Sequence, residues 1–139
     1  MPGDDSRAFA DVIADAYRIE REIGRGGWGL VYVAHDLRND RRVAIKLLRG
    51  EFTGSVSGDR SRREIEILSR LHHPNIVALY DWGEFERAPW YAMSYVDGET
   101  LRARLDRERQ LPIGEALRIA REVAVALAYA HSSDVCIVT

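Results

Sequence analysis

Gly24-Arg25-Gly26-Gly27-Trp28-Gly29-Leu30-Val31 is the stretch that decides the fold of this chain. Glycines lack a side chain, so a loop with this spacing lets backbone amides approach phosphate groups closely. A dinucleotide-binding fold would need a helix directly after the glycines, whereas the β-branched and aromatic run to Ala34 indicates a strand. A glycine hairpin that binds no ligand is the other open interpretation.

Further strands are expected on both sides of the glycines. Residues 17–23 alternate apolar and polar side chains, and residues 42–48 form another strand-like run. The Asn39-Asp40 pair has turn chemistry and favours an antiparallel hairpin, so we do not expect a parallel nucleotide-binding sheet. Two more strands are expected at 76–81 and 90–96.

Helices are expected in the remaining parts of the chain. Residues 62–71 have helical spacing, and Pro74 pushes the preceding residue out of helical geometry; the glycines and serines of 49–61 indicate a loop. A short helix is expected near residues 100–107. A long helix from Pro112 to about His131 has an apolar face wide enough to need burial on more than one side. Residues 1–16 are a lead-in, either helical or flexible.

Lys46 is the first candidate for chemistry outside the glycines. Strand alternation places it on the same face as the small residue Ala44, one strand away from the glycine hairpin. Lysine usually points to solvent, but the order of the glycine loop and then Val43-Ala-Ile-Lys46 argues against that here. A lysine that faces phosphate needs a carboxylate to hold it. Glu64 is the candidate and Glu66, about 200° away around the helix, is the competitor; the alternative for both is a solvated face.

The composition and net charge of the chain argue against several classes of binding partner. The chain has 139 residues, 46% of them hydrophobic and 30% charged, with a formal net charge of -2. This balance lacks the basic footprint of nucleic-acid or membrane binding. The single Cys136 and the acidic start without a signal peptide predict a cytoplasmic protein. The uncharged stretch 123–133 is too short to span a bilayer, and the four histidines lack metal-ligand spacing, so no metal site is expected.

From about Tyr17 to His131 the chain resembles the small lobe of protein kinases, and its motifs are most similar to those of the bacterial serine/threonine type. The resemblance implies an α+β fold with a five-stranded antiparallel sheet, one regulatory helix, a hinge, and the first two helices of the large lobe. It also implies a division into a lead-in at 1–16, the small lobe at 17–96, and the start of the large lobe at 97–139.

The resemblance further implies ATP as the ligand and gives each site residue a role. The loop over the phosphates consists of Gly24, Arg25, Gly26, Gly27, Trp28 and Gly29. Val31 and Ala44 cap the adenine ring, Lys46 contacts the α- and β-phosphates, and Glu64 holds Lys46. Met93 is the gatekeeper beside Ser94, Tyr95 and Val96, whose backbone pairs with adenine, and Glu99 or Asp97 reaches the ribose. Ser94 departs from the usual glutamate, and Trp28 stands where Phe or Met is common.

After His131 the family continues to a His-Arg-Asp motif, whereas this chain reads Ser132-Ser-Asp-Val-Cys-Ile-Val-Thr139. We therefore expect a truncated, catalytically inactive chain, with Mg²⁺ and protein substrates bound only by the intact family member. Codons for Val-His-Arg-Asp-Leu-Lys, read with one base dropped, encode Cys-Ile-Val-Thr and a stop, which suggests a frameshift. The alternative function is a pseudokinase-like regulatory module. The apolar face of the 113–131 helix predicts self-association or poor solubility.

Overall fold

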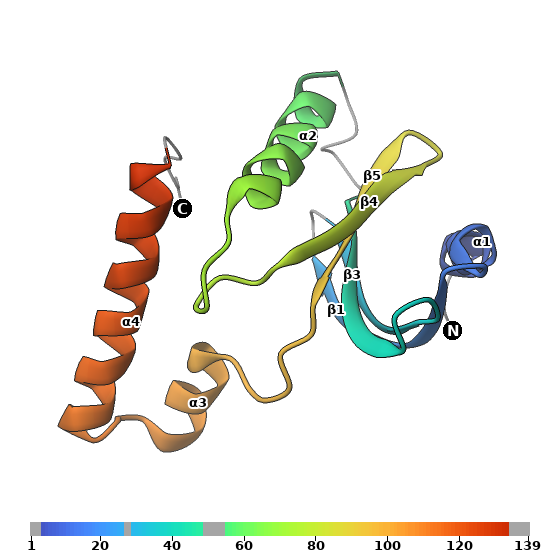
Figure 1. Ribbon diagram of the computed structural model, residues 1–139. Coiled ribbons are helices and arrows are strands. Elements are labelled where there is room, and N and C mark those ends of the chain that lie inside the picture. The colour runs from blue at the N-terminus through green and yellow to red at the C-terminus, as the bar shows by residue number, and fades with distance from the viewer. Residues whose placement is uncertain (1–3, 27–28, 49–54, 134–139) are drawn as a thin grey trace. The chain divides into compact units, whose positions relative to one another are not determined.

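The computed structural model describes residues 4–26, 29–48 and 55–133 (Figure 1). The chain forms two compact units, one made of residues 1–69 and 78–95, the other of residues 70–77 and 96–139. The first unit contains the sheet and two helices, and the second contains two further helices. The glycine hairpin and the strands next to it all belong to the first unit.

A five-stranded sheet with every neighbouring pair antiparallel forms the first unit, which confirms the expected fold class. The spatial order is β1-β2-β3-β5-β4. The strands are β1 Tyr17–Gly26, β2 Gly29–Asp36, β3 Arg41–Leu48, β4 Leu79–Phe85 and β5 Ala88–Ser94. The β2 and β3 strands alternate between two environments, because successive side chains of a strand point to opposite faces.

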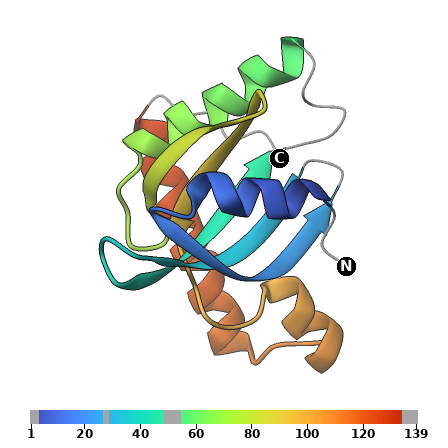
Figure 2. The ribbon, with the colours of Figure 1, turned by 90° about the vertical axis from the view of Figure 1, so that its right-hand side faces the viewer.

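One face of the sheet is an apolar core closed by the first helix, α1 Asp4–Ile13. Phe9 of α1 is fully buried there, with its ring centroid 5.4 Å from that of Phe85 and 6.1 Å from that of Trp90. Ser6 Oγ and the Tyr32 hydroxyl lie 2.9 Å apart, which gives two buried hydroxyls a partner. Figure 2 shows α1 lying across the strands. The lead-in is therefore a docked helix.

The opposite face carries the second helix, α2 Ser55–Arg70. Ile65 and Leu68 of α2 pack with Leu48 and Tyr91, which lie on β3 and β5. The helix begins at Ser55, so the loop expected at 49–61 is wrong from that residue onward; residues 49–54 lie outside the described part of the chain. Serine and glycine are weak helix formers, but packing of an apolar helix face outweighs such local preferences.

The fourth strand lies later in the chain than the sequence predicts, because the turn that follows it has no recognisable turn sequence. The strand runs from Leu79 to Phe85, later than the expected 76–81, and a tight turn joins it to β5. Glu86 and Arg87 form this turn with φ angles of 48° and 67°. Such turns are usually marked by Asn-Gly or Asp-Gly, so a Glu-Arg turn has no local signature.

The turn between β2 and β3 depends on a buried carboxylate. Asp36 accepts hydrogen bonds from the backbone N–H groups of Arg38 and Asn39, at 3.0 and 3.2 Å, and from the Asn39 amide at 2.8 Å. Burial opposes ionisation, but these hydrogen bonds and the Arg41 guanidinium hold the pKa of Asp36 below its ordinary value. The ionised carboxylate therefore shapes the expected hairpin.

The second unit consists of α3 Leu101–Glu108 and α4 Ile113–Ser132. Thr100 caps α3 by accepting a hydrogen bond from Ala103 N, and Arg104 forms a bidentate pair with Glu115 at 2.6 and 2.8 Å. The Tyr129 hydroxyl of α4 accepts a hydrogen bond of 2.9 Å from His72 N, which ties residues 70–77 to this unit. Among the described residues, no helix is both long and apolar enough to cross a membrane.

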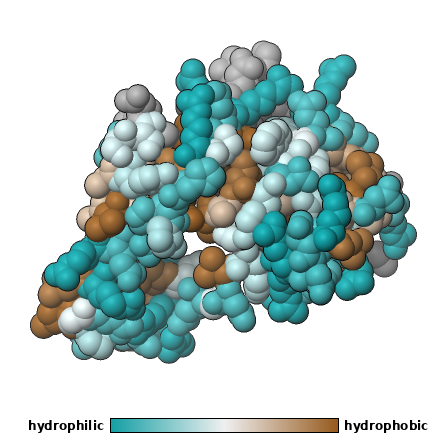
Figure 3. All heavy atoms as spheres, in the orientation of Figure 1, coloured by the Kyte–Doolittle hydropathy of each residue, from teal (hydrophilic) through white to brown (hydrophobic). Residues whose placement is uncertain are grey.

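An apolar groove of about 460 Å³ lies between α3 and α4. Its lining comes from Leu101, Leu105, Leu111, Ala116, Ile119, Ala120, Val123, Ala124 and Leu127. Val123 remains 51% exposed, and apolar side chains are visible at the surface along α4 in Figure 3. The wide apolar face expected from the sequence is thus largely open within this unit.

Replacing Asp36 by Ala should lower the free energy of unfolding by about 1–3 kcal/mol, because several donors lose one buried acceptor. A carboxylate whose pKa is lowered by folding stabilises the native state above its unfolded pKa, and that stability is lost as the pH falls through the folded pKa. Urea unfolding at pH 7 should therefore separate the variant from wild type, and the gap should narrow below about pH 4. A gap that stays constant with pH would contradict the role of the ionised form.

Candidate functional site

Four residues from four strands lie opposite one another in a single row across the sheet. Gly24 of β1 pairs with Val31 of β2, Val31 pairs with Lys46 of β3, and Lys46 pairs with Tyr91 of β5. Directly paired residues of antiparallel strands present their side chains on the same face. The row therefore aligns the first glycine of the loop with the lysine.

A second row runs parallel to the first and completes one patch of the face. Val33 of β2 pairs with Ala44, and Ala44 pairs with Met93 of β5. Because Ala44 and Lys46 are two residues apart on one strand, both rows belong to the same face, the one opposite Phe9. The patch thus combines the ammonium with short or apolar side chains at Val31, Ala44 and Met93.

The Lys46 ammonium lies beside a carboxylate of α2. Its Nζ is 3.5 Å from Glu64 Oε1, and its side chain is only 16% exposed. The same carboxylate oxygen accepts a hydrogen bond of 2.8 Å from the Tyr91 hydroxyl. Burial, with the charge of Glu64 and this hydrogen bond, raises the pKa of Tyr91, so the phenol stays protonated and donates.

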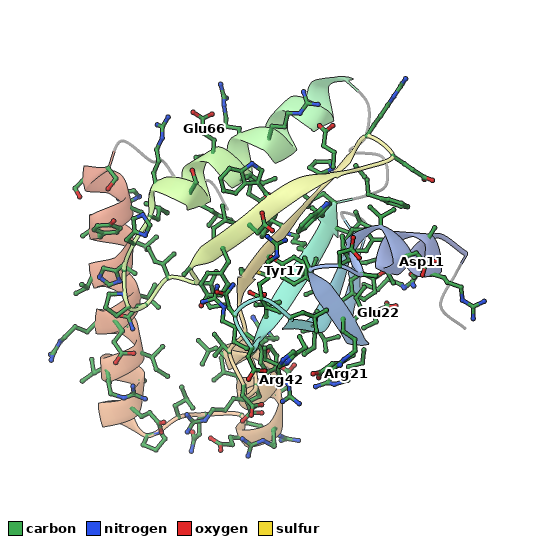
Figure 4. All side chains as sticks on the ribbon, turned by 45° about the vertical axis from the view of Figure 1, so that its right-hand side comes forward. Asp11, Tyr17, Arg21, Glu22, Arg42 and Glu66 are labelled. Atoms are coloured by element: carbon green, nitrogen blue, oxygen red, sulfur yellow. The ribbon has the colours of Figure 1, made fainter. Side chains whose placement is uncertain are left out.

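Glu66, the competing acid, has an exposed side chain. Figure 4 shows the Glu66 side chain on α2, and this residue lines a groove beside Trp82 of β4 and Pro89 of β5. The two acids are two positions apart in a helix, which separates their side chains by about 200°. The structure thus brings Glu64 to Lys46.

The glycine hairpin approaches β3 so closely that one position excludes a side chain. Gly29 has a φ of 149°, and a Cβ built there would lie 2.1 Å from the Leu47 carbonyl oxygen. Gly26 pairs with Gly29 at the end of the β1–β2 ladder, while Gly27 and Trp28 lie outside the described residues. Arg25 points to solvent and pairs with Glu22 at 2.8 Å, which raises the pKa of the Arg25 guanidinium.

The residues expected to form the hinge fall into both units. Ser94 ends β5, and its N–H donates to the Ala78 carbonyl at 2.9 Å, so any pairing of Ser94 with a base would use its carbonyl oxygen. Tyr95 is the last residue of the first unit. Val96 and Glu99 belong to the second unit, where Val96 is exposed and Glu99 forms an ion pair with Arg107.

The sheet, the glycine hairpin and the lysine–carboxylate pair all lie within one family match that covers most of the chain. A family model described as the protein kinase domain matches residues 17–137. This chain belongs to the protein kinase domain family.

Bacterial serine/threonine kinases are among the relatives of this kinase chain. It is 41% identical over 126 residues to the probable serine/threonine-protein kinase PknB of Lactococcus lactis, covering 89% of this chain and 20% of that protein. It is 40% identical over 124 residues to the serine/threonine-protein kinase PrkC of Bacillus subtilis, covering 88% and 19%. The chain therefore spans about a fifth of the length of these relatives.

Solved kinase domains share the fold. The crystal structure of the PknI kinase domain of Mycobacterium tuberculosis superposes with a TM-score of 0.74 at 36% identity, covering 85% of this chain and 48% of that one. The dinucleotide-binding interpretation of the glycines is excluded, because β2 begins at Gly29 and the sheet is antiparallel.

Mg²⁺ accompanies ATP in protein kinases, where it is held by oxygen ligands. Within the described ranges, no three His, Cys, Asp or Glu side chains are grouped to hold a metal ion.

Tyr91 is the site residue that sequence reasoning missed. Strand alternation over residues 90–96 places Tyr91 on the same face as Met93, so its position was accessible from the pattern. Its partner was not, because the hydroxyl meets a carboxylate 27 positions away in sequence.

Substitution of Gly29 by Ala should destabilise this kinase chain by about 1–3 kcal/mol, because a Cβ would meet the Leu47 carbonyl and force the backbone to move. Gly24→Ala is the matched control in the same hairpin, since its Cβ would meet only the Val31 side chain at 3.6 Å. Urea unfolding of both variants measures the difference. Equal loss in the two variants would show that the close approach at Gly29 is unimportant.

Proposed function

We propose that this chain is the ATP-binding part of a serine/threonine protein kinase that transfers a phosphoryl group from ATP to protein serine or threonine. The observation that carries the proposal is that Gly24, Val31 and Lys46 lie in one row across the sheet, with Lys46 Nζ 3.5 Å from Glu64 Oε1. A glycine loop and an ammonium on adjacent strands present backbone donors and a positive charge to the same phosphate chain.

Each group in the patch has a task in this proposal. Gly24, Gly26 and Gly29 let the backbone of the hairpin lie over the phosphates, and Lys46 compensates the charge of the α- and β-phosphates. Val31 and Ala44 provide apolar contact for the adenine ring, because Ala44 is small enough to leave room for a planar base. The gatekeeper role goes to Met93, next to the backbone of Ser94, Tyr95 and Val96.

The proposal for residues 1–139 concerns nucleotide binding and not turnover. Phosphoryl transfer relies on positioning the nucleophile and on neutralising charge with metal ions. This chain spans about a fifth of the length of the curated relatives it matches. Phosphorylation of protein substrates is therefore proposed for the whole protein, of which this chain is one portion.

A regulatory or interaction module is the second candidate, and the open groove of α3 and α4 favours it. Such a module would contact another protein or a second copy of itself through apolar surface and would need no nucleotide. Lys46 separates the two functions, since only nucleotide binding depends on it.

Lys46→Met should weaken ATP binding by roughly 10- to 100-fold, the equivalent of losing a hydrogen bond to a charged group. Isothermal titration of the full chain with ATP measures the change. Stability should change little, because Glu64 keeps its 2.8 Å hydrogen bond from Tyr91.

Arg42→Met is the control for the loss of positive charge. Arg42 lies on the same strand but forms an exposed ion pair with Glu20 at 3.2 Å, so its removal should leave ATP affinity nearly unchanged. Equal affinity of wild type and Lys46→Met, or no ATP binding by wild type, would overturn the proposal and favour the interaction module.

Val123→Glu should reduce self-association of the chain, because the added charge lies on the open apolar face of α4. Light scattering at increasing protein concentration measures the apparent mass. Gln110→Glu adds the same charge at an exposed polar position and should leave association as in wild type. Identical behaviour of the two variants would show that this face does not drive association.

A further inference from the structure

The shortest described contact to the Glu64 carboxylate comes from the phenol of Tyr91 and not from Lys46. Tyr91 is 3% exposed, and its hydroxyl lies 2.8 Å from Glu64 Oε1. Lys46 Nζ is 3.5 Å from the same oxygen, at the outer limit of a hydrogen bond. Two donors on neighbouring strands therefore converge on one oxygen of α2, and the buried one is the closer.

The relative strength of these two contacts follows from distance and solvent. Hydrogen bonds to an ionised acceptor are stronger than neutral ones when they are short. The Glu64 side chain is 42% exposed, so water screens its attraction to the more distant ammonium. The phenol thus contributes more than the lysine to fixing the position of this carboxylate.

Tyr91 also connects α2 to the sheet through its ring. The ring packs with Ile65 of α2 and Leu48 of β3 in the buried cluster of this face, joined by Leu68, Leu79 and Met93. Lys46 Nζ lies 5.9 Å from the ring centroid, within the range of a cation–π attraction. One side chain therefore contacts the helix, the carboxylate and the lysine.

We propose that Tyr91 is a positioning residue for nucleotide binding, whose hydroxyl holds Glu64 and helix α2 in place beside Lys46 before ATP arrives. This inference rests on the proposed function, because it assumes that Lys46 contacts ATP. A carboxylate that a second donor already holds stays in place when the ammonium moves toward phosphate. The ordering of α2 then takes place at folding and does not reduce the affinity for ATP.

Tyr91→Phe tests the inference, since it removes only the hydroxyl and keeps the ring in the apolar cluster. Binding of ATP to the full chain, measured by isothermal titration, should weaken about tenfold relative to wild type. Amide hydrogen exchange in residues 64–70 of α2 should become faster in the absence of ATP, because the helix loses its hydrogen bond to the sheet.

Tyr17→Phe is the matched control. Tyr17 is also a buried tyrosine of this sheet, and its hydroxyl donates to a carboxylate, Asp81 Oδ2, at 2.9 Å. It belongs to the apolar core on the face of Phe9. Both Tyr→Phe variants should lose some thermal stability, but Tyr17→Phe should bind ATP as wild type does and leave exchange in α2 unchanged.

A double-mutant cycle with Glu64→Ala measures whether the effect of Tyr91→Phe on ATP affinity depends on the Glu64 carboxylate. A purely structural role of Tyr91 would not produce such a dependence. In the Glu64→Ala background the phenol has no carboxylate to hold, so adding Tyr91→Phe should leave ATP affinity unchanged. If Tyr91→Phe binds ATP as tightly as wild type, or if it weakens binding equally in both backgrounds, the inference is wrong.

Wild type and Lys46→Met distinguish this failure from failure of the proposed function. If wild type binds ATP and Lys46→Met binds it weakly, nucleotide binding holds and the Tyr91 result decides the inference alone. If wild type does not bind ATP, the proposed function fails and the inference fails with it.

Discussion

One carboxylate, that of Glu64, joins helix α2 to two neighbouring strands, and the arrangement of the sheet face that carries Lys46 depends on it. Without this acceptor the Tyr91 hydroxyl would be buried with no partner, which is unfavourable, and the Lys46 ammonium would lose its nearest described counter-charge. The Glu64 carboxylate therefore does two things at once: it accepts the hydrogen bond of a buried phenol, and it holds the Lys46 ammonium near the glycine hairpin.

The division of the sheet into two unlike faces makes this arrangement possible. Aromatic and aliphatic side chains fill the face that α1 covers, with Phe9 fully buried at its centre. That core stabilises the strands from one side. The opposite face can then combine an ammonium, a carboxylate and small residues such as Ala44, which stabilise little by packing.

In the second unit, local polar contacts are satisfied while many apolar side chains stay exposed. Thr100 caps the start of α3, and the bidentate pair of Arg104 with Glu115 joins α3 to the first turn of α4. The apolar side chains of the groove remain open within the unit. The two helices are therefore specified by local contacts. The apolar face of α4 is wider than α3 alone covers, so part of it stays exposed within this unit.

The sequence by itself determined the strands around the glycines and the face shared by Ala44 and Lys46, because each follows from local periodicity. It separated Glu64 from Glu66 by about 200° around a helix, and the structure shows that Glu64 is the acid beside Lys46. Only the tertiary structure decided the start of α2 at Ser55, the Glu86-Arg87 turn, the docking of Phe9 and the contact of Tyr91 with Glu64. The first two lack local signatures, and the last two join segments distant in sequence. A hydrogen bond such as that from Tyr91 to Glu64 exists only once helix packing and strand register bring both residues together.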